Sequence, residues 1–372
     1  MATATGQGDI RDRLGIEHPI VGFTPSEHVA AAISRAGGLG VLGCVRFNDA
    51  EELDATLDWL DANTDGKPYG VDVVMPMNAP TEGSAIDLST LIPQEHRDFV
   101  DRTLEELGVP ALPGGVAEGA GVLGWLHSVA RAQVDVALRH RPALIANALG
   151  SPPKDVIDEA HAAGVPVAAL AGRVVHAQRQ VDDGVDIVVA QGHEAGGHTG
   201  EITSMVLLPE VVDAVGDRAL VLGAGGIGCG RQVAAALALG ASGVWMGSAW
   251  LLAEEYGKGF PGSAAMQDAL LHASSSDTVR SRIYSGKPAR LLRSRWSEAW
   301  AAPDAPEPLP MPLQNLLVAE AHLRISAAED PGVIAMPAGQ IIGRFDRIRP
   351  VADMMADLVE ETRTAIARLA AF

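Results

Sequence analysis

The chain alternates short runs of apolar, often β-branched residues with longer alanine-rich stretches that have the apolar spacing of amphipathic helices. This alternation is typical of parallel strands joined by helices. It predicts eight strands, at His18–Phe23, Leu39–Leu42, Tyr69–Met75, Ala143–Asn147, Val165–Leu170, Asp186–Ala190, Ala219–Leu222 and Gly243–Met246. Eight such strands match a closed (β/α)8 TIM barrel, in which function gathers in the loops after the strands. An open, doubly wound sheet is the competing topology, because counting strands does not distinguish the two.

Two long segments do not fit the minimal alternation. Residues Thr81–Arg141 are too long for one crossover connection, and prolines with Gly114-Gly115 divide them into helical pieces. We expect either a helical insertion that forms a lid over the strand ends or a peripheral decoration that the fold tolerates. The barrel is expected to span residues 1–300. Residues 301–372 are expected to form a C-terminal helical segment that packs on the barrel and ends in an amphipathic helix at about Pro350–Leu369.

The formal net charge of −19 over 372 residues narrows the range of partners. Nucleic acids and anionic lipid surfaces bind basic patches, so neither is expected as a partner, and a small-molecule substrate fits better. Cys44 and Cys229 are the only cysteines, which gives neither a disulfide framework nor a set of thiolate ligands for a metal. Because Met1–Gly15 also lack the apolar core of a signal peptide, a cytoplasmic location is expected.

One uncharged run, Val233–Ala253, reaches the length of a membrane span. Gly240, Gly243 and Gly247 interrupt this run. That pattern favours a short helix stopped by a glycine and followed by a buried strand and a turn. We therefore expect no membrane-spanning segment.

A glycine-rich loop with two histidines follows the predicted strand Asp186–Ala190, and its sequence is Gln191-Gly192-His193-Glu194-Ala195-Gly196-Gly197-His198-Thr199-Gly200. Helical zinc sites place two histidines at i and i+4, whereas these are at i and i+5, and a glycine pair disfavours a helix, so no metal site is expected. The glycine pair lets the backbone pass close to a planar ligand while His198 projects toward it. An imidazole suits proton transfer near neutral pH, which makes His198 the candidate base. His193 and Glu194 are expected to anchor the loop.

Two further glycine-containing loops follow the last two predicted strands. Gly223–Gly228 matches the G-x-G-x-x-G pattern of dinucleotide folds, but no acidic residue follows at the distance needed to hold a ribose hydroxyl. Barrels commonly bind a phosphate with the loops after their seventh and eighth strands. Gly225, Gly226, Gly247 and Ser248 form the candidate phosphate site, because glycine permits close approach of backbone amides and a serine hydroxyl can donate. A pair of tight turns without a ligand is the alternative.

Taken together, these motifs resemble those of the nitronate monooxygenases, formerly called 2-nitropropane dioxygenases, which are FMN-binding TIM-barrel flavoenzymes. The resemblance covers most of residues 15–300 and is carried by Ala190–Gly200, Gly225–Ile227, Gly230–Ala241 and Met246–Ser248, with weaker support from Ala36–Gly40 and Ser285–Arg290. It implies that His198 is the active-site histidine and that FMN is the cofactor. The cofactor-binding residues that it implies are Gln191, Gly192, Gly197, Gly225, Gly226, Ile227, Gly247, Ser248 and Gln340.

Three positions near the expected flavin ring depart from the usual pattern of that family. The first strand reads Val21-Gly22-Phe23-Thr24-Pro25 where a Gln and a Met are usual, Asp72 stands where the third strand often has Asn, and Leu170 stands where a Gln or Lys usually faces the flavin. Loss of a hydrogen-bond donor near the ring would weaken the stabilisation of a reduced, anionic flavin. We therefore expect an altered ring environment.

The reaction that the resemblance implies is FMN-dependent oxidation of alkyl nitronates or nitroalkanes by O2 to a carbonyl compound and nitrite. His198 would act as the base, and no reduced nicotinamide would be needed. A small-molecule substrate and O2 are the expected partners, and a homodimer is compatible with the sequence.

Two alternatives remain open at this point. The first is an FMN-dependent NAD(P)H oxidoreductase that acts on enoyl- or acyl-thioesters, whose phosphates could bind a basic cluster of Arg280, Arg282, Lys287, Arg290, Arg293 and Arg295. The same cluster could instead lie on an exposed helix and pair with nearby carboxylates. The second alternative is a protein that binds a flavin or phosphate ligand without turnover.

Overall fold

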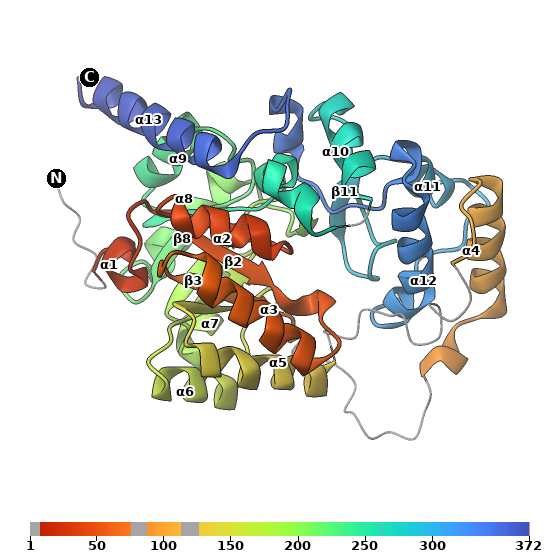
Figure 1. Ribbon diagram of the computed structural model, residues 1–372, viewed down its shortest axis with the longest axis horizontal. Coiled ribbons are helices and arrows are strands. Elements are labelled where there is room, and N and C mark those ends of the chain that lie inside the picture. The colour runs from red at the N-terminus through yellow and green to blue at the C-terminus, as the bar shows by residue number, and fades with distance from the viewer. Residues whose placement is uncertain (1–7, 76–87, 113–125, 261, 372) are drawn as a thin grey trace.

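A closed barrel of eight parallel strands forms the centre of the molecule (Figure 1). The structure is a computed structural model that describes residues 8–75, 88–112, 126–260 and 262–371. In barrel order, the strands are β1 (Ile20–Thr24), β2 (Leu39–Gly43), β3 (Tyr69–Val73), β4 (Leu144–Asn147), β5 (Val167–Ala171), β6 (Ile187–Gln191), β8 (Leu220–Ala224) and β9 (Gly243–Met246).

The predicted (β/α)8 barrel is confirmed, and each of the eight predicted strands is present within a few residues of its expected ends. Closure is direct, because β1 pairs in parallel with β2 on one side and with β9 on the other. In an open, doubly wound sheet, the first and last strands would not pair. The competing topology is therefore excluded.

Helices surround the barrel and extend from it on one side. The α-helices are α1 (Ile10–Leu14), α2 (Glu27–Arg35), α3 (Ala50–Asn63), α4 (Gln94–Glu106), α5 (His127–His140), α6 (Lys154–Ala162), α7 (Val174–Asp183), α8 (Ser204–Val215), α9 (Gly230–Ala238), α10 (Ser263–His272), α11 (Arg295–Ala299), α12 (Leu313–Ala328) and α13 (Val351–Ala370). Short 3-10 turns are η1 (Cys44–Arg46), η2 (Leu88–Leu91), η3 (Ser248–Leu252), η4 (Glu254–Lys258), η5 (Pro331–Val333) and η6 (Gln340–Arg344).

Strand residues alternate between the barrel interior and the layer under the helices, as the two-residue repeat of a strand requires. One apolar cluster fills the interior and includes Val21, Val41, Leu144 and Val189. A second cluster, between the strands and the helices on one side, contains the intervening residues Val71 and Val73 together with residues from α3 and α5. Side chains at the carboxyl ends of the strands that face inward therefore point into the barrel mouth.

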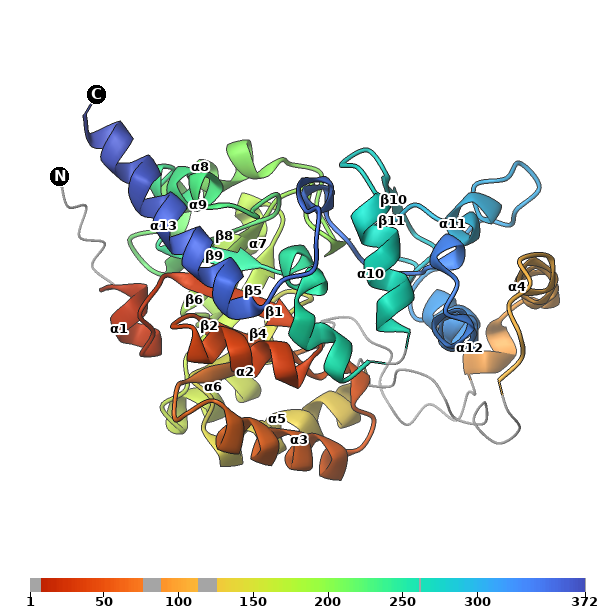
Figure 2. The same ribbon diagram turned by 45° about the horizontal axis from the view of Figure 1, so that its top comes forward.

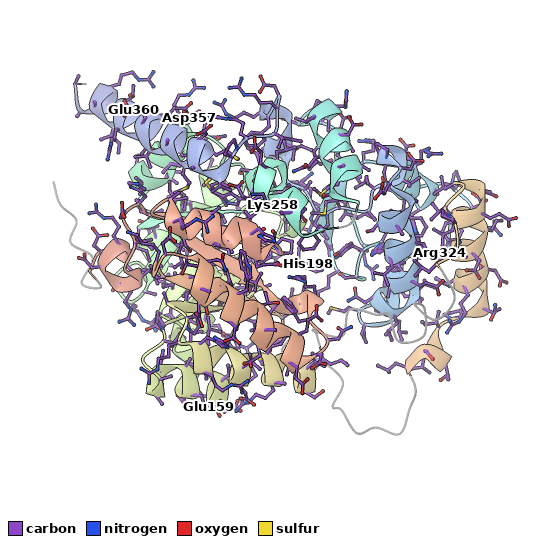
Figure 3. The ribbon with its side chains drawn as sticks, in the orientation of Figure 1. Glu159, His198, Lys258, Arg324, Asp357 and Glu360 are labelled. Carbon is purple, nitrogen blue, oxygen red and sulfur yellow. The ribbon has the colours of Figure 1, made fainter. Side chains whose placement is uncertain are left out.

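A second lobe stands beside the barrel (Figures 1 and 2). It contains α4, α11, α12 and a small antiparallel sheet in the order β10 (Thr278–Ser281), β11 (Ala289–Leu292) and β7 (Gly197–His198). Its apolar core joins Phe99 and Leu104 of α4 to Trp296 and Val318 of the C-terminal half. Arg324 of α12 (Figure 3) donates hydrogen bonds to the carbonyls of Val109 and Pro110, in the segment that follows α4, at 3.0 Å.

The segment Thr81–Arg141 lies partly outside the described residues. Within its described part, α4 belongs to the second lobe, whereas α5 packs on α3 and β3 of the barrel. After the lobe, the chain returns to the barrel, where α13 packs on α9 and α2. The lid role of the insertion and the domain boundary at residue 300 remain predictions.

The uncharged run Val233–Ala253 folds as the sequence predicts. The helix α9 ends before Gly240, whose φ is 97°, and β9 and η3 follow. In the described part of the chain, no helix is both long enough and apolar enough to span a bilayer.

Candidate active site

The loop that follows β6 is held at the barrel mouth by its own glutamate. The Glu194 carboxylate accepts the amide of Ser204 at 3.2 Å and also the Ser204 hydroxyl, at the first turn of α8. A carboxylate at a helix N-terminus is favoured by the helix dipole and by the free amides there. Gly192 is needed at this contact, because a Cβ there would lie 2.4 Å from the Ser204 nitrogen. Glu194 therefore anchors the loop, as expected from the sequence.

His193 anchors the same loop from the other side. The Arg290 guanidinium donates to the His193 carbonyl at 3.1 Å and to the ring Nδ1 at 3.0 Å, and Arg290 is 4% exposed. Because arginine only donates, Nδ1 must be unprotonated. Burial, and then the Arg290 charge, lower the pKa of His193 accordingly. His193 therefore holds the loop through its contacts with Arg290.

His198 lies where the barrel meets the second lobe (Figure 3). It sits on β7 and pairs with Ala289 of β11, and its Nε2 is 2.6 Å from the Ser285 hydroxyl. The Ser285 oxygen also accepts the Lys287 amide at 3.3 Å, which fixes the hydroxyl. The Tyr284 ring meets the imidazole edge-on, with centroids 6.4 Å apart. The second lobe therefore orients a side chain that the barrel loop supplies.

The surroundings of His198 keep its ring neutral. Burial, and secondarily the positive charge of Lys287, lower the pKa of His198 to about 4. Among the described residues, no carboxylate bonds the ring to stabilise an imidazolium. At neutral pH, His198 can accept a proton or a hydrogen bond on one nitrogen and donate from the other.

The loops after β8 and β9 leave backbone N–H groups unused. In the described parts of the chain, the amides of Gly225, Gly226, Gly247 and Ser248 donate to no protein acceptor, and these residues are partly exposed. Gly225 and Gly226 have φ of 99° and 68°, which strains any residue with a Cβ. Ile227, the next residue, is buried. Successive free amides in such a turn form a concave site suited to an anion.

A late segment of the chain closes over these loops. The Gly339 amide donates to the Ser248 hydroxyl at 2.8 Å, and the Gln340 amide donates to the Glu194 carbonyl at 2.9 Å. Gly196 makes this contact possible, because a Cβ there would lie 2.8 Å from the Gly339 nitrogen. The Ser248 hydroxyl keeps its own proton available for a ligand.

The opposite side of the mouth is lined by side chains. Phe23 and Leu170 face the barrel interior, and Phe23 stacks on Trp245 with ring centroids 6.2 Å apart. Asp72 is 4% exposed, and burial raises its pKa to about 8. Gly22 faces the opposite way, because a Cβ there would lie 2.5 Å from Ile33 under the helices. Its departure from the family pattern therefore concerns packing, not the mouth.

The structure brings nearly all the predicted site residues into one region. Gln191 ends β6, Gly192 donates its amide to the Ala224 carbonyl at 2.9 Å, and Gly197 pairs with Arg290. Their roles toward a cofactor stay predictions. Sequence reasoning missed Ser285 and Tyr284, although the motif that starts at Ser285 had been noted as a weak resemblance.

The basic cluster does not form a single helix. Arg280 and Arg290 lie on strands β10 and β11, not on an exposed helix. Arg290 is buried against His193, and Arg280 bonds to Thr199. The helix expectation holds for Arg295, which begins α11 and pairs with Asp330. It is wrong for Arg280 and Arg290, because alternation over four-residue strands is too short to recognise among so many charges. Two members of the cluster hold the histidine loop in place.

A sequence profile described as nitronate monooxygenase matches residues 11–361. A protein of Mycobacterium tuberculosis, whose name describes it as a proposed monooxygenase, is 47% identical over 373 residues, with 97% of each chain covered. A protein of Staphylococcus aureus strain Newman, named as a probable nitronate monooxygenase, is 28% identical over 362 residues, covering 94% of this chain and 95% of that protein.

Two solved structures are similar along nearly the whole chain. Nitroalkane oxidase from Streptomyces ansochromogenes superposes with a TM-score of 0.80 at 27% identity, covering 97% of this chain and 99% of that one. FabK from Thermotoga maritima superposes with a TM-score of 0.72 at 26% identity, covering 97% and 98%. The similarity includes both the barrel and the second lobe.

Proposed function

The chain belongs to the nitronate monooxygenase family of flavin-dependent oxidoreductases, and from that premise we propose that it oxidises alkyl nitronates with O2, using FMN bound at the barrel mouth. The products are a carbonyl compound and nitrite. The observation that carries the proposal is the juxtaposition of a neutral His198 with a cluster of free backbone amides at the same mouth. The likeness to a nitroalkane oxidase structure supports the same substrate class.

The residues at the mouth fit FMN. The free amides after β8 and β9 and the Ser248 hydroxyl would hold the phosphate, and the glycines leave room for it to approach the backbone. Gln191, Gly192, Gly197 and Gln340 would flank the ring system. When bound, the flavin supplies the site that accepts electrons from the substrate and passes them to O2.

His198 would act on the substrate carbon. With its pKa lowered to about 4, it is unprotonated across the physiological range and ready to accept a proton. A catalytic base works best when its pKa lies near the operating pH, so this histidine is a poor match for a neutral, weakly acidic nitroalkane. We therefore place nitronates, which arrive already deprotonated, ahead of nitroalkanes as substrates.

The test is an aerobic assay of the purified, flavin-loaded enzyme with ethylnitronate and, separately, nitroethane. We expect nitrite release and O2 consumption with both compounds, and a higher kcat/KM with the nitronate. A protein that holds its flavin yet releases no nitrite from either compound would contradict the proposal.

The thioester alternative is the second candidate, and the FabK structure is similar to this chain along nearly its whole length. Its other support is weakened, because Arg280 and Arg290 of the basic cluster are engaged within the protein. Anaerobic bleaching of the flavin by NADPH would favour this alternative, and bleaching by the nitronate would favour the first. A cytoplasmic location and a homodimer complete the proposal and can be checked by fractionation and by light scattering.

A further inference from the structure

Asp72 is a buried carboxyl group on the inner side of the barrel. It is the penultimate residue of β3, and its barrel neighbours are Gly43 on β2 and Ala146 on β4, neither of which has a polar side chain. Val71 and Val73, on either side of it, face the helices, so Asp72 faces the interior. Its position near the carboxyl end of the strand directs it toward the mouth.

Among the described residues, the Oδ1 atom of this carboxyl group has no partner. Its Oδ1 atom is inaccessible to solvent and has no hydrogen-bond partner, and in the described residues no cation forms an ion pair with it. Leaving a buried polar group unsatisfied costs about 1–3 kcal/mol, and leaving a buried charge unpaired costs more. A carboxyl group in these surroundings keeps its proton, and burial raises the pKa of Asp72 to about 8.

The groups packed around β3 do not change this conclusion. From η1, the titratable neighbour is Cys44, an acid whose pKa is itself raised, first by burial and then by Asp72. Arg46 on the same turn pairs with Glu27. On the outer helices, Arg35 bonds the Asn63 carbonyl, and the remaining pairs are Arg131 with Asp155 and Glu159, Arg139 with Asp54, and His140 with Asp54 and Asp61. None of these contacts offers positive charge to Asp72.

A protonated carboxyl group carries an O–H donor, and the Oδ1 atom has no hydrogen-bond partner among the described residues. The nearby thiol of Cys44 is directed to the Leu42 carbonyl at 3.6 Å. A ligand bound in the mouth can supply this acceptor. The polar edges of an isoalloxazine ring carry carbonyl oxygens and ring nitrogens that accept hydrogen bonds.

We propose that Asp72 contacts the bound flavin ring as a neutral carboxylic acid and donates its O–H to an acceptor on the polar edge of the ring. This inference rests on the proposed flavin binding. A hydrogen bond donated by a carboxylic acid makes the affinity for the cofactor depend on pH. Because the neutral form binds, affinity is constant below the pKa of Asp72 in the free protein and falls as the pH rises through about 8.

The test compares the wild type with Asp72→Asn and Asp72→Ala. FMN dissociation constants are measured from fluorescence quenching between about pH 7 and pH 9.5. We expect wild-type affinity to fall about tenfold per pH unit above pH 8, relative to Asp72→Asn, which has a donor that does not titrate. The titrations of FMN itself cancel in this ratio. At pH 7, Asp72→Ala should bind about threefold to tenfold more weakly than the wild type.

Two other outcomes would overturn the proposal. A wild-type affinity that rises with pH toward 8 would mean that an ionised Asp72 accepts a hydrogen bond from the ring. Parallel pH profiles of the wild type and Asp72→Asn would mean that Asp72 does not contact the ring, although the proposed function would stand.

A second readout requires no cofactor. In difference infrared spectra of the flavin-free protein, the wild type at pH 7 should show the carbonyl stretch of a protonated carboxylic acid, which disappears at high pH and in Asp72→Asn. Absence of that band overturns the neutral-acid assignment even if FMN fails to bind. If the band is present but FMN does not bind, the proposed function is contradicted, and so is the contact between Asp72 and the ring. The assignment of Asp72 as a neutral acid would still stand.

Discussion

The two sides of the barrel mouth are built differently. After β8 and β9, the backbone provides the polar groups, as free amides of glycines with positive φ beside one serine hydroxyl. At the ends of β1, β3 and β5, side chains provide the surface, and Phe23, Asp72 and Leu170 offer one polar group between two apolar ones. A site made of backbone amides depends only on where glycines occur. A site made of side chains changes its polarity and shape with every substitution. The first side therefore suits a constant feature of the ligand, such as a phosphate, and under our proposal the second side would tune the ring.

The largest effect is expected at His198, whose replacement should reduce turnover without weakening the binding of FMN to either side of the mouth. Replacing His198 with Asn keeps a similar size and a hydrogen-bonding group toward Ser285 but removes the proton acceptor. Turnover of nitroethane, which must lose its α-proton to this acceptor, should fall about 10²- to 10⁴-fold, while FMN affinity stays within about twofold of the wild type. Steady-state nitrite assays and fluorescence quenching measure the two quantities. Unchanged turnover would remove His198 from the mechanism.

A smaller effect is expected on the phosphate side. Gly225→Ala places a Cβ on a residue with φ of 99°, 3.3 Å from Ala195. The strain of about 1–2 kcal/mol should weaken FMN binding about fivefold to thirtyfold. Gly66→Ala is the matched control, because Gly66 has φ of 71° but nothing within 4 Å of its Cβ position. Equal FMN affinity in both variants would show that Gly225 does not shape the site.

A third effect is expected in the second lobe, where a histidine, like Asp72 in the barrel, is buried without an opposite charge beside it. Burial lowers the pKa of His322 to about 4, and its Nε2 has no hydrogen-bond partner among the described residues. A histidine whose folded pKa is lowered contributes full stability above its unfolded pKa of about 6.5 and loses it as the pH falls toward 4. Denaturation of the wild type should show this loss, and His322→Phe should show a slope smaller by about one proton. The same slope in both proteins would contradict the assignment.

The smallest effect concerns the ring side. Leu170→Gln would add a hydrogen-bond donor where the barrel interior is apolar. It should raise the two-electron reduction potential of the bound flavin by roughly 10–30 mV, by stabilising the reduced ring. Potentiometric titration measures this shift, with Leu170→Met as the control for volume. Equal potentials in the two variants would show that residue 170 does not face the ring.

Strands and glycine loops could be predicted from the sequence because they depend on local patterns. The runs at β6, β8 and β9 and the glycines after them carry their own signals. Their number matched a closed barrel, but only the pairing of β1 with β9 excludes an open sheet. The sheet of β7, β10 and β11 could not be predicted, because β7 has only two residues and pairs with β11, far along the chain. The same distance hid the Ser285 contact of His198 and the burial of Arg290 against His193. The sequence shows Asp72 as a departure from the family pattern. It does not show the protonation state of Asp72, which depends on the groups around it in three dimensions.

The most direct test of the account compares the binding of FMN and riboflavin, which differ only by the phosphate, to the flavin-free protein by isothermal titration calorimetry. Hydrogen bonds to a charged group contribute about 1.5–3 kcal/mol each, so two amides from the loops after β8 and β9 should make FMN at least about a hundredfold tighter than riboflavin. Gly225→Ala should reduce that ratio. Equal affinities for the two flavins, or no binding of either, would contradict the assignment of these loops as the phosphate site.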